Sequence, residues 1–110
     1  MEQNTRSDIN KRMQELGYES WTEQPVIVDV PKSGTERIQA FNEHYFLFDI
    51  SDVDTLFSIR SDNDFITSED YIVTGSPVIF PEFTGNITIS NMSALSDLRF
   101  VFIQVIPDFN

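Results

Sequence analysis

Acidic side chains crowd the middle of this chain, and carboxylates can bind metal ions or act as general acids and bases. Seven of them lie close together in the sequence: Asp49, Asp52, Asp54, Asp62, Asp64, Glu69 and Asp70. Calcium binds about six to eight oxygen ligands, which Asp and Asn residues in loops often supply. Residues 62–64 have this composition, but the glycine and the terminal glutamate of an EF-hand loop are missing. Solvated acidic loops are the simpler interpretation, and a calcium site is the alternative.

No other pattern in the sequence indicates catalytic residues. Two carboxylates can cleave a glycosidic bond from opposite sides, yet no pair of acids here has a privileged position. His44 is the only histidine, so it cannot build a multi-histidine metal site, and the Gly-x-Ser-x-Gly turn of serine hydrolases is missing. The four glycines are scattered and form no phosphate-binding loop. We expect no enzyme activity, no metal and no cofactor.

Aromatic side chains offer a different chemistry, because their faces can stack on sugar rings. Four of them could form such a platform, as in carbohydrate-binding modules, or could be ordinary core and interface residues: Tyr18, Trp21, Tyr45 and Tyr71. Phe80 and Phe83 bracket a turn that contains proline, which is a contact patch if exposed and a plug for the end of a sandwich if folded inward. A carbohydrate-binding β-sandwich module is therefore the alternative function.

The composition limits the classes of partner. With 110 residues the chain can form one domain with a single core. Its formal net charge of −11 argues against nucleic acid and against an anionic membrane surface, which both attract clustered Lys and Arg. There is no cysteine, so disulfides and thiolate chemistry are excluded. We expect synthesis in a cytoplasm, because the polar N-terminal residues do not resemble a signal peptide and no apolar run could span a membrane.

The first structural element that the sequence predicts is a short helix. Ser7 as N-cap and Gly17 just past the end predict a helix between them, in which Ile9, Met13 and Leu16 form one narrow apolar stripe. A helix of about three turns is not stable alone in water, so it must dock on another surface. Two interpretations stay open: the helix packs on the sheet of its own domain, or it grips a neighbouring subunit.

From Pro25 onward the pattern changes to short strands separated by turns. About eight or nine strands are expected, over residues 26–30, 35–41, 44–50, 55–60, 65–67, 70–74, 78–80, 86–90 and 98–106. Strands at this spacing, without helices between them, are typical of an antiparallel sandwich or barrel rather than a parallel α/β sheet.

The last of these strands is the most informative, because both of its faces are apolar. A strand points alternate side chains to opposite sides. One side carries Leu98, Phe100, Phe102 and Ile106, and the other carries Val101, Ile103 and Val105. The first side can pack into a sandwich core, whereas the second needs another cover, which a second chain could supply.

Four segments resemble small β-sandwich proteins of bacterial virus particles: Tyr45–Ser51, Leu56–Ser61, Phe83–Asn91 and Leu98–Ile106. The pattern that they form, from Tyr45 to Pro107, covers a little over half of the chain and is a style of sequence rather than one motif. The resemblance implies a non-enzymatic structural role, as a capsid decoration, minor capsid or spike-base component. It also implies a symmetric, often trimeric assembly that uses a terminal segment for attachment, and it carries over no catalytic residue.

These observations predict an all-β protein with two parts. Residues 1–22 form an amphipathic helical arm, and residues 23–110 form an antiparallel, jelly-roll-like β-sandwich of about eight short strands. The expected function is assembly within a virion, with copies of the same chain, a trimer above all, and with other virion proteins, and without nucleic acid or membrane. The candidate interface residues are Ile9, Met13, Leu16, Tyr18, Trp21, Phe80, Phe83, Val101, Ile103 and Val105.

Overall fold

One helix and eight strands make up the described part of this chain. The computed structural model describes residues 2–52, 55–68 and 82–108. In chain order the elements are α1 (Glu2–Glu15), β1 (Trp21–Val30), β2 (Thr35–Gln39), β3 (His44–Ile50), β4 (Phe57–Arg60), β5 (Phe65–Thr67), β6 (Glu82–Phe83), β7 (Asn86–Asn91) and β8 (Leu98–Pro107). The predicted all-β class is confirmed. The strand candidates at 70–74 and 78–80 lie outside the described residues.

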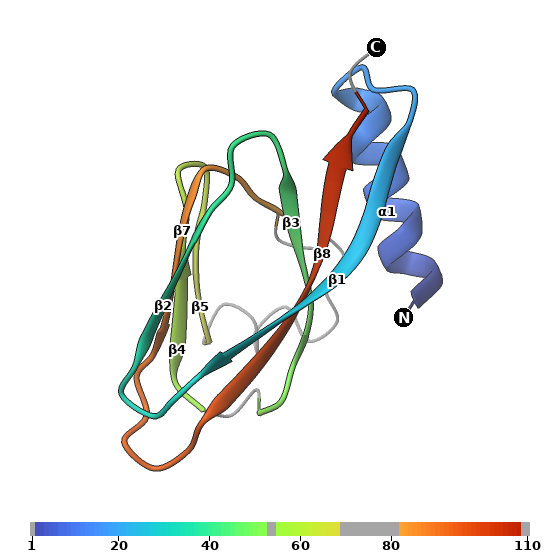
Figure 1. Cartoon of the computed structure of the whole chain (residues 1–110). Helices are drawn as coiled ribbons and strands as arrows, with labels where there is room; N and C mark the ends of the chain where they lie inside the picture. Colours follow the sequence, from blue (N-terminus) through green and yellow to red (C-terminus); the bar gives the residue numbers. More distant parts are fainter. Residues whose placement is uncertain (1, 53–54, 69–81, 109–110) are drawn as a thin grey trace.

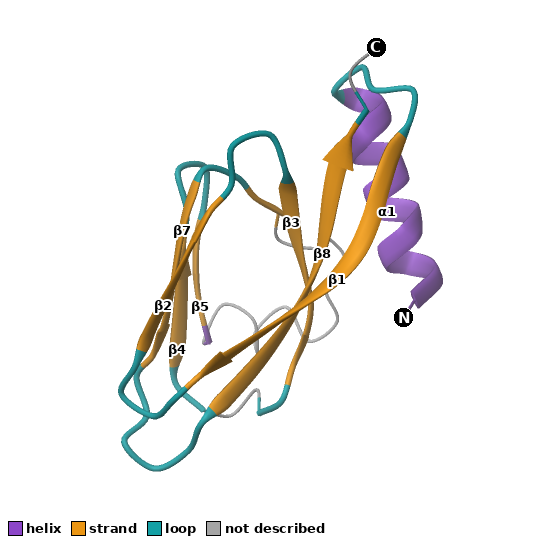
Figure 2. Ribbon diagram, in the orientation of Figure 1, coloured by secondary structure: helices purple, strands orange, loops and turns teal. Residues whose placement is uncertain are grey.

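The strands form two four-stranded antiparallel sheets that face each other (Figures 1 and 2). Sheet I has the order β1-β8-β3-β6, and sheet II has the order β2-β7-β4-β5. The pairs β1–β8, β2–β7, β3–β6 and β4–β5 are each antiparallel neighbours. These four pairs follow one another like a long hairpin folded across itself, which is the connectivity of a jelly roll. The predicted jelly-roll-like sandwich is therefore the observed fold.

The core between the sheets is built from alternate residues of each strand. Leu98, Phe100 and Phe102 of β8 point into it and are almost completely buried. The Phe57 ring of sheet II meets Phe100 edge to face, with the ring centroids 5.3 Å apart. Burial of each phenylalanine contributes about 1.5–3 kcal/mol, so these rings account for much of the attraction between the sheets.

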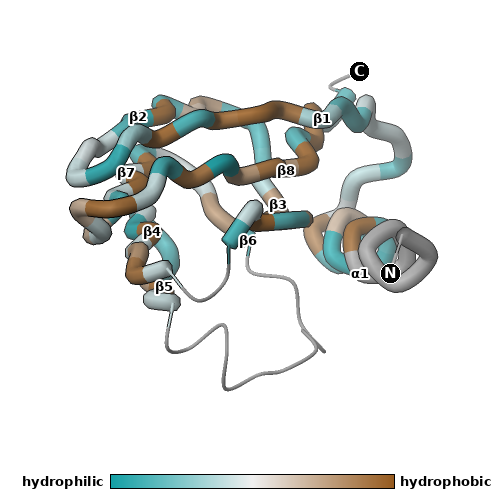
Figure 3. Tube along the Cα trace, turned by 90° about the horizontal axis from the view of Figure 1, so that it is seen from below, coloured by the Kyte–Doolittle hydropathy of each residue, from teal (hydrophilic) through white to brown (hydrophobic). Residues whose placement is uncertain are grey.

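A third layer covers the outer face of sheet I, where α1 lies against β8 and β3 (Figure 3). Val105 of β8 and Phe46 of β3 are buried there against Ile9 and Met13 of the helix, and Ile103 packs beside them. The odd-numbered side of β8 therefore receives the second cover that its sequence requires, and the cover is the chain's own helix. Of the two interpretations of the helix, packing on its own domain is the observed one.

Backbone hydrogen bonds explain where the helix stops. Gly17 has φ 88°, a left-handed conformation that glycine adopts without strain. The amide of Tyr18 donates to the carbonyl of Met13, and the amide of Gly17 donates to the carbonyl of Gln14. This pair of bonds is a Schellman motif, which closes the last turn. The predicted end of the helix at Gly17 is confirmed.

The beginnings of two elements differ from prediction. The helix starts at Glu2 rather than beside Ser7, because the residues before Ser7 include neither Gly nor Pro to stop it. β1 starts at Trp21 rather than beyond Pro25, since the whole of β1 pairs with β8. Proline is tolerated here because β1 is an edge strand. The strand thus begins inside the segment 1–22 that was assigned to the arm.

Gln104 interrupts the apolar pattern of β8 at the point where the β1–β8 ribbon leaves the sandwich. Its amide nitrogen donates to the Tyr45 hydroxyl at 2.8 Å, and its amide oxygen accepts a hydrogen bond from Gln24 of β1. Buried polar groups need such partners. The β1–β8 ribbon projects beyond sheet II (Figure 1), and the three side chains form one hydrogen-bonded polar group across β1, β8 and β3.

Candidate interaction surfaces

A clamp of charged side chains fastens α1 to sheet I. Nε of Arg12 in the helix donates to Oε2 of Glu82 in β6 at 2.7 Å, and Nδ1 of His44 in β3 lies 3.6 Å from Oε1 of the same carboxylate. Burial opposes ionisation of Glu82, but the neighbouring His44 and Arg12 outweigh it and lower the pKa of Glu82. The hydrogen bond with Glu82 raises the pKa of Arg12. The clamp joins α1, β3 and β6 at one point.

Four of the candidate interface residues are buried inside the chain itself. Ile9, Met13 and Val105 lie between helix and sheet, and Phe83 lies in the sandwich core, each with no exposed surface. Ile9, Met13 and Val105 cannot contact a partner while α1 stays docked, and Phe83 is enclosed between the two sheets, so none of the four expected interface residues lies on the surface of this chain. Phe83 was expected to be either part of an exposed contact patch or a plug for the end of the sandwich. It is folded inward, as the second alternative predicts, because β6 aligns it with Tyr45 of β3.

The remaining candidates lie around the helix-covered face. Tyr18, Trp21 and Ile103 are partly buried and pack against the helix–sheet cluster, and Val101 is partly buried on β8. Leu16 is 39% exposed at the end of the helix. Phe80 lies outside the described residues. Only Leu16 among these residues presents a largely free side chain.

A sugar platform of Tyr and Trp is not formed by the described residues. Trp21 packs beneath the helix, and the Tyr18 ring meets His44 edge to face with centroids 6.2 Å apart. Tyr45 is buried in the sandwich core, and burial raises the pKa of its hydroxyl. Tyr71 lies outside the described residues. The aromatic side chains therefore serve packing, as in the simpler of the two interpretations.

The acidic residues of the middle region cap turns. Oδ2 of Asp52 accepts a hydrogen bond from the Thr55 hydroxyl at 2.6 Å, and Asp64 accepts one from the amide of Phe65. Asp62 accepts from the amide of Asn86, a residue of β7. Within the part of the chain that the structure describes, no three His, Asp or Glu side chains gather into a metal site. Asp54, Glu69 and Asp70 are outside that part.

Three exposed apolar side chains lie on neighbouring loops at one end of the sandwich, which we call the apolar tip; Ile27 of β1, which is also 60% exposed, lies outside it. Its members are Leu56, Met92 and Leu95, with exposed fractions of 60%, 60% and 89%. The amide of Met92 donates to the carbonyl of Leu56 at 2.9 Å, so the two loops run side by side. In Figure 1 these loops form the lower end of the molecule, away from the helix termini. Exposed apolar patches mark contact sites.

Asn91 holds the loop of the apolar tip in place, although it is itself buried. Its amide nitrogen donates to the carbonyls of Val30 and Ser96, and its amide oxygen accepts from the amide of Ser93. Residues 91–97 lie between two predicted strands, and the sequence did not predict this surface. The signal was the presence of Met92 and Leu95 in an otherwise polar segment.

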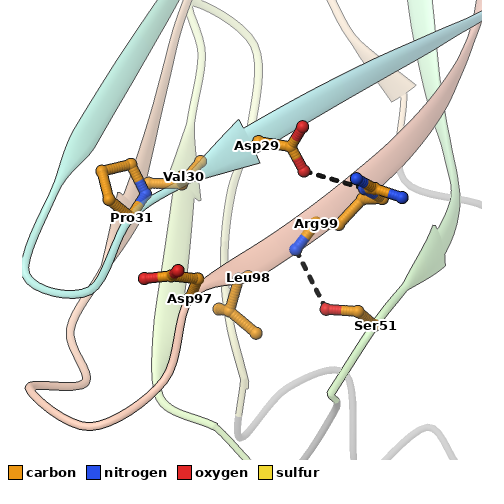
Figure 4. Close-up of a pocket in the computed structure, with 7 residues that line it drawn as sticks. All are labelled: Asp29, Val30, Pro31, Ser51, Asp97, Leu98 and Arg99. Carbon is orange, nitrogen blue, oxygen red and sulfur yellow. Dashed lines mark hydrogen bonds and ion pairs between the residues drawn. The ribbon is translucent and has the colours of Figure 1, made fainter.

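A hollow of about 500 Å³ opens beside the apolar tip (Figure 4). Arg99 crosses it, with its guanidinium Nε 2.8 Å from Oδ1 of Asp29 and its backbone amide donating to the Ser51 hydroxyl. Asp97 on the rim accepts a hydrogen bond from the amide of Lys32. Because Arg99 is paired with Asp29 and Asp97 binds a backbone amide, the residues that line this hollow offer no unpaired cation to a ligand.

The outer edge of β1 is protected against pairing with another strand. Among residues 2–52, 55–68 and 82–108, no strand pairs with this edge. Pro25 in its middle has no amide hydrogen, and Glu23 and Asp29 place carboxylates on either side. Proline and charge on an edge strand prevent edge-to-edge association. The β1 edge is therefore poorly suited to extend sheet I by pairing with a strand of another chain.

Comparison of the chain with protein-family models, with curated proteins and with solved structures gives no match. In the described part of the chain, no helix is long and apolar enough to cross a membrane.

Proposed function

We propose that this chain is a non-enzymatic structural or accessory protein of a virus particle and acts by binding other protein chains. The observation that carries the proposal is the apolar tip, where Leu56, Met92 and Leu95 are exposed together on neighbouring loops. Such residues are costly to leave in water and are typical of the apolar centre of an interface.

Two further features support a particle component. The jelly-roll connectivity occurs in viral capsid proteins, although a fold alone does not fix a function. Segments of β3, β4, β7 and β8 carry the resemblance to small virion β-sandwich proteins. Capsid decoration, minor capsid and spike-base roles all use the same kind of protein–protein contact.

Self-association is the form of this proposal that can be measured on the purified chain. Closed symmetric oligomers are the commonest assemblies of identical chains. We expect a discrete oligomer, with a trimer first, in which copies of the apolar tip meet around the symmetry axis. Removing three large aliphatic side chains from water on each chain would supply several kcal/mol, at about 25 cal/mol per Å².

Native mass spectrometry and light scattering of the full chain test this. The triple variant L56S/M92S/L95S should be monomeric under conditions where the unchanged chain is oligomeric. Phe41→Ser is the matched control, because Phe41 is exposed but outside the apolar tip. A monomeric unchanged chain at about 100 µM, or a triple variant with unchanged mass, would reject self-assembly through the tip.

A further inference from the structure

The outer face of sheet II is polar across its four strands apart from Phe65 of the edge strand β5. Ile87 and Ile89 of β7 and Ile59 of β4 point into the sandwich core. The residues between them therefore point the other way, away from sheet I, because side chains alternate along a strand. Figure 3 shows sheet II as one outer layer and α1 as the other, so the helix does not cover this face.

Strand register places two arginines in one row across this face. Arg37 of β2 and Arg60 of β4 are both aligned with Thr88 of β7, which lies between them. Phe65 of β5 is aligned with Arg60 and completes the row. Two strand spacings separate the arginine backbones, about 9.6 Å. The row therefore places one positive charge on each side of the Thr88 hydroxyl group.

A second row beside the first consists of hydroxyl side chains. Its members are aligned in the order Thr35, Ser90, Ser58 and Thr67 across the four strands. Each lies two residues along its strand from a member of the arginine row, a separation of about 6.8 Å. Hydroxyls both donate and accept hydrogen bonds.

Both arginines are available to a ligand. Arg12 is paired with Glu82, and Arg99 is paired with Asp29. No carboxylate of the described residues lies within ion-pair distance of Arg37 or Arg60, and both side chains are exposed. The guanidinium of Arg60 lies over the Phe65 ring, 4.6 Å from its centroid, which limits its motion. Two exposed arginines without a carboxylate partner among the described residues are unusual in a chain whose formal net charge is −11.

A concave feature adjoins the arginine row at the β2–β7 pair. This hollow has a volume of about 500 Å³, and Arg37, Gln39, Asn86 and Thr88 contribute polar groups to its lining. Gln39 and Asn86 are aligned with each other and form a third polar row. Guanidinium, amide and hydroxyl groups thus converge at one place.

We propose that the outer face of sheet II binds an acidic polysaccharide. Guanidinium groups bind carboxylate and sulfate with charge-assisted hydrogen bonds, and the hydroxyl and amide rows match the hydroxyls of a sugar chain. The centre of the face has no large aliphatic side chain, unlike the centre of a typical protein interface. Two arginines are too few for the phosphate contacts of nucleic acid. The proposal is independent of assembly through the apolar tip.

Binding of the full chain to oligogalacturonate and to chondroitin sulfate, measured by calorimetry in low salt, tests the proposal. Fully methyl-esterified oligogalacturonate is the matched neutral ligand. We expect binding to at least one acidic saccharide and none to the ester. Arg37→Gln with Arg60→Gln should weaken binding by at least about tenfold, the effect of one lost charge-assisted hydrogen bond.

Lys11→Gln with Lys32→Gln is the control, because it changes the net charge equally from exposed positions elsewhere. It should alter the affinity less than about twofold, and the far-UV circular dichroism of both double variants should match the unchanged chain. The proposal is overturned if neither acidic saccharide binds at about 1 mM repeating units, if both double variants lose affinity equally, or if the ester binds as well. Stronger binding to polyglutamate or to DNA than to either saccharide would also overturn it and assign the face to an acidic peptide or to nucleic acid.

Discussion

Replacing Met13 with alanine tests whether α1 is an integral layer of the fold. Met13 has no exposed surface and is buried in the cluster that holds Ile9, Phe46 and Val105. Truncating such a side chain removes its transfer free energy and leaves a cavity, which together cost about 2–5 kcal/mol. We therefore expect Met13→Ala to lower the free energy of unfolding by this amount.

Urea titration followed by two signals measures the effect. Trp21 is the only tryptophan and packs against the same cluster, so its fluorescence reports on helix docking. Far-UV circular dichroism reports on the strands and helix together. With a urea dependence of about 1–3 kcal/mol per M, the loss should lower the fluorescence midpoint by between about 0.7 and 5 M.

Leu16→Ala is the control on the same helix, because Leu16 is 39% exposed at its end. It should cost less than about 1 kcal/mol, as surface substitutions usually do. Equal midpoints for Met13→Ala and Leu16→Ala would refute the reasoning, since the helix would then contribute nothing through its buried face. If only the fluorescence transition moves, α1 unfolds separately from the sandwich.

Two further predictions concern buried polar contacts. Glu82→Gln should lower the free energy of unfolding by about 1–3 kcal/mol at pH 7. Because the pKa of Glu82 is lowered in the folded state, this difference should be fully present above the ordinary pKa of a glutamate and fall toward zero as the pH drops through the lowered pKa of folded Glu82, whereas the exposed Glu36→Gln should show no such dependence. Asn91→Ala should cost about 2–4 kcal/mol by leaving the carbonyls of Val30 and Ser96 without their side-chain donor, and a cost no larger than that of the exposed Asn42→Ala would contradict the anchoring role of Asn91.

The sequence predicted the strands whose pattern is local. The alternation of Leu98, Phe100 and Phe102 with Val101 and Ile103 requires only the two-residue period of a strand, and the structure confirms both faces. The end of the helix at Gly17 was predictable for the same reason, because the signal and the structure involve neighbouring residues.

What covers the second face of β8 could not be predicted from these patterns. A helix of the same chain and a strand or helix of a partner satisfy the apolar requirement of Ile103 and Val105 equally well. Deciding between them requires knowing that the loop after Gly17 returns Trp21 to pair with Pro107. That pairing joins residues far apart in the sequence, and hydrophobic periodicity contains no information about it.

The arginine row was hidden for a related reason. Arg37 and Arg60 are isolated charges in the sequence, and only the register of β2, β7 and β4 brings them to either side of Thr88. A shift of one residue in either pairing would turn one arginine toward the core. Ile38 of β2 and Ile59 of β4, which pack in the core opposite Ile87 and Ile89, oppose such a shift because it would turn them toward water. The apolar sides of β2 and β4 thus fix the positions of the arginines on the other side.

The same logic separates the two proposed contacts. The helix covers part of the outer face of sheet I, and Pro25 with its flanking carboxylates protects the edge of β1. The apolar tip and the outer face of sheet II differ in chemistry: one has three exposed apolar side chains, and the other has two guanidinium groups without a carboxylate partner among the described residues. Salt should therefore weaken saccharide binding by sheet II while leaving association through the tip unchanged or stronger. A common response of both contacts to salt would mean that a single surface performs both.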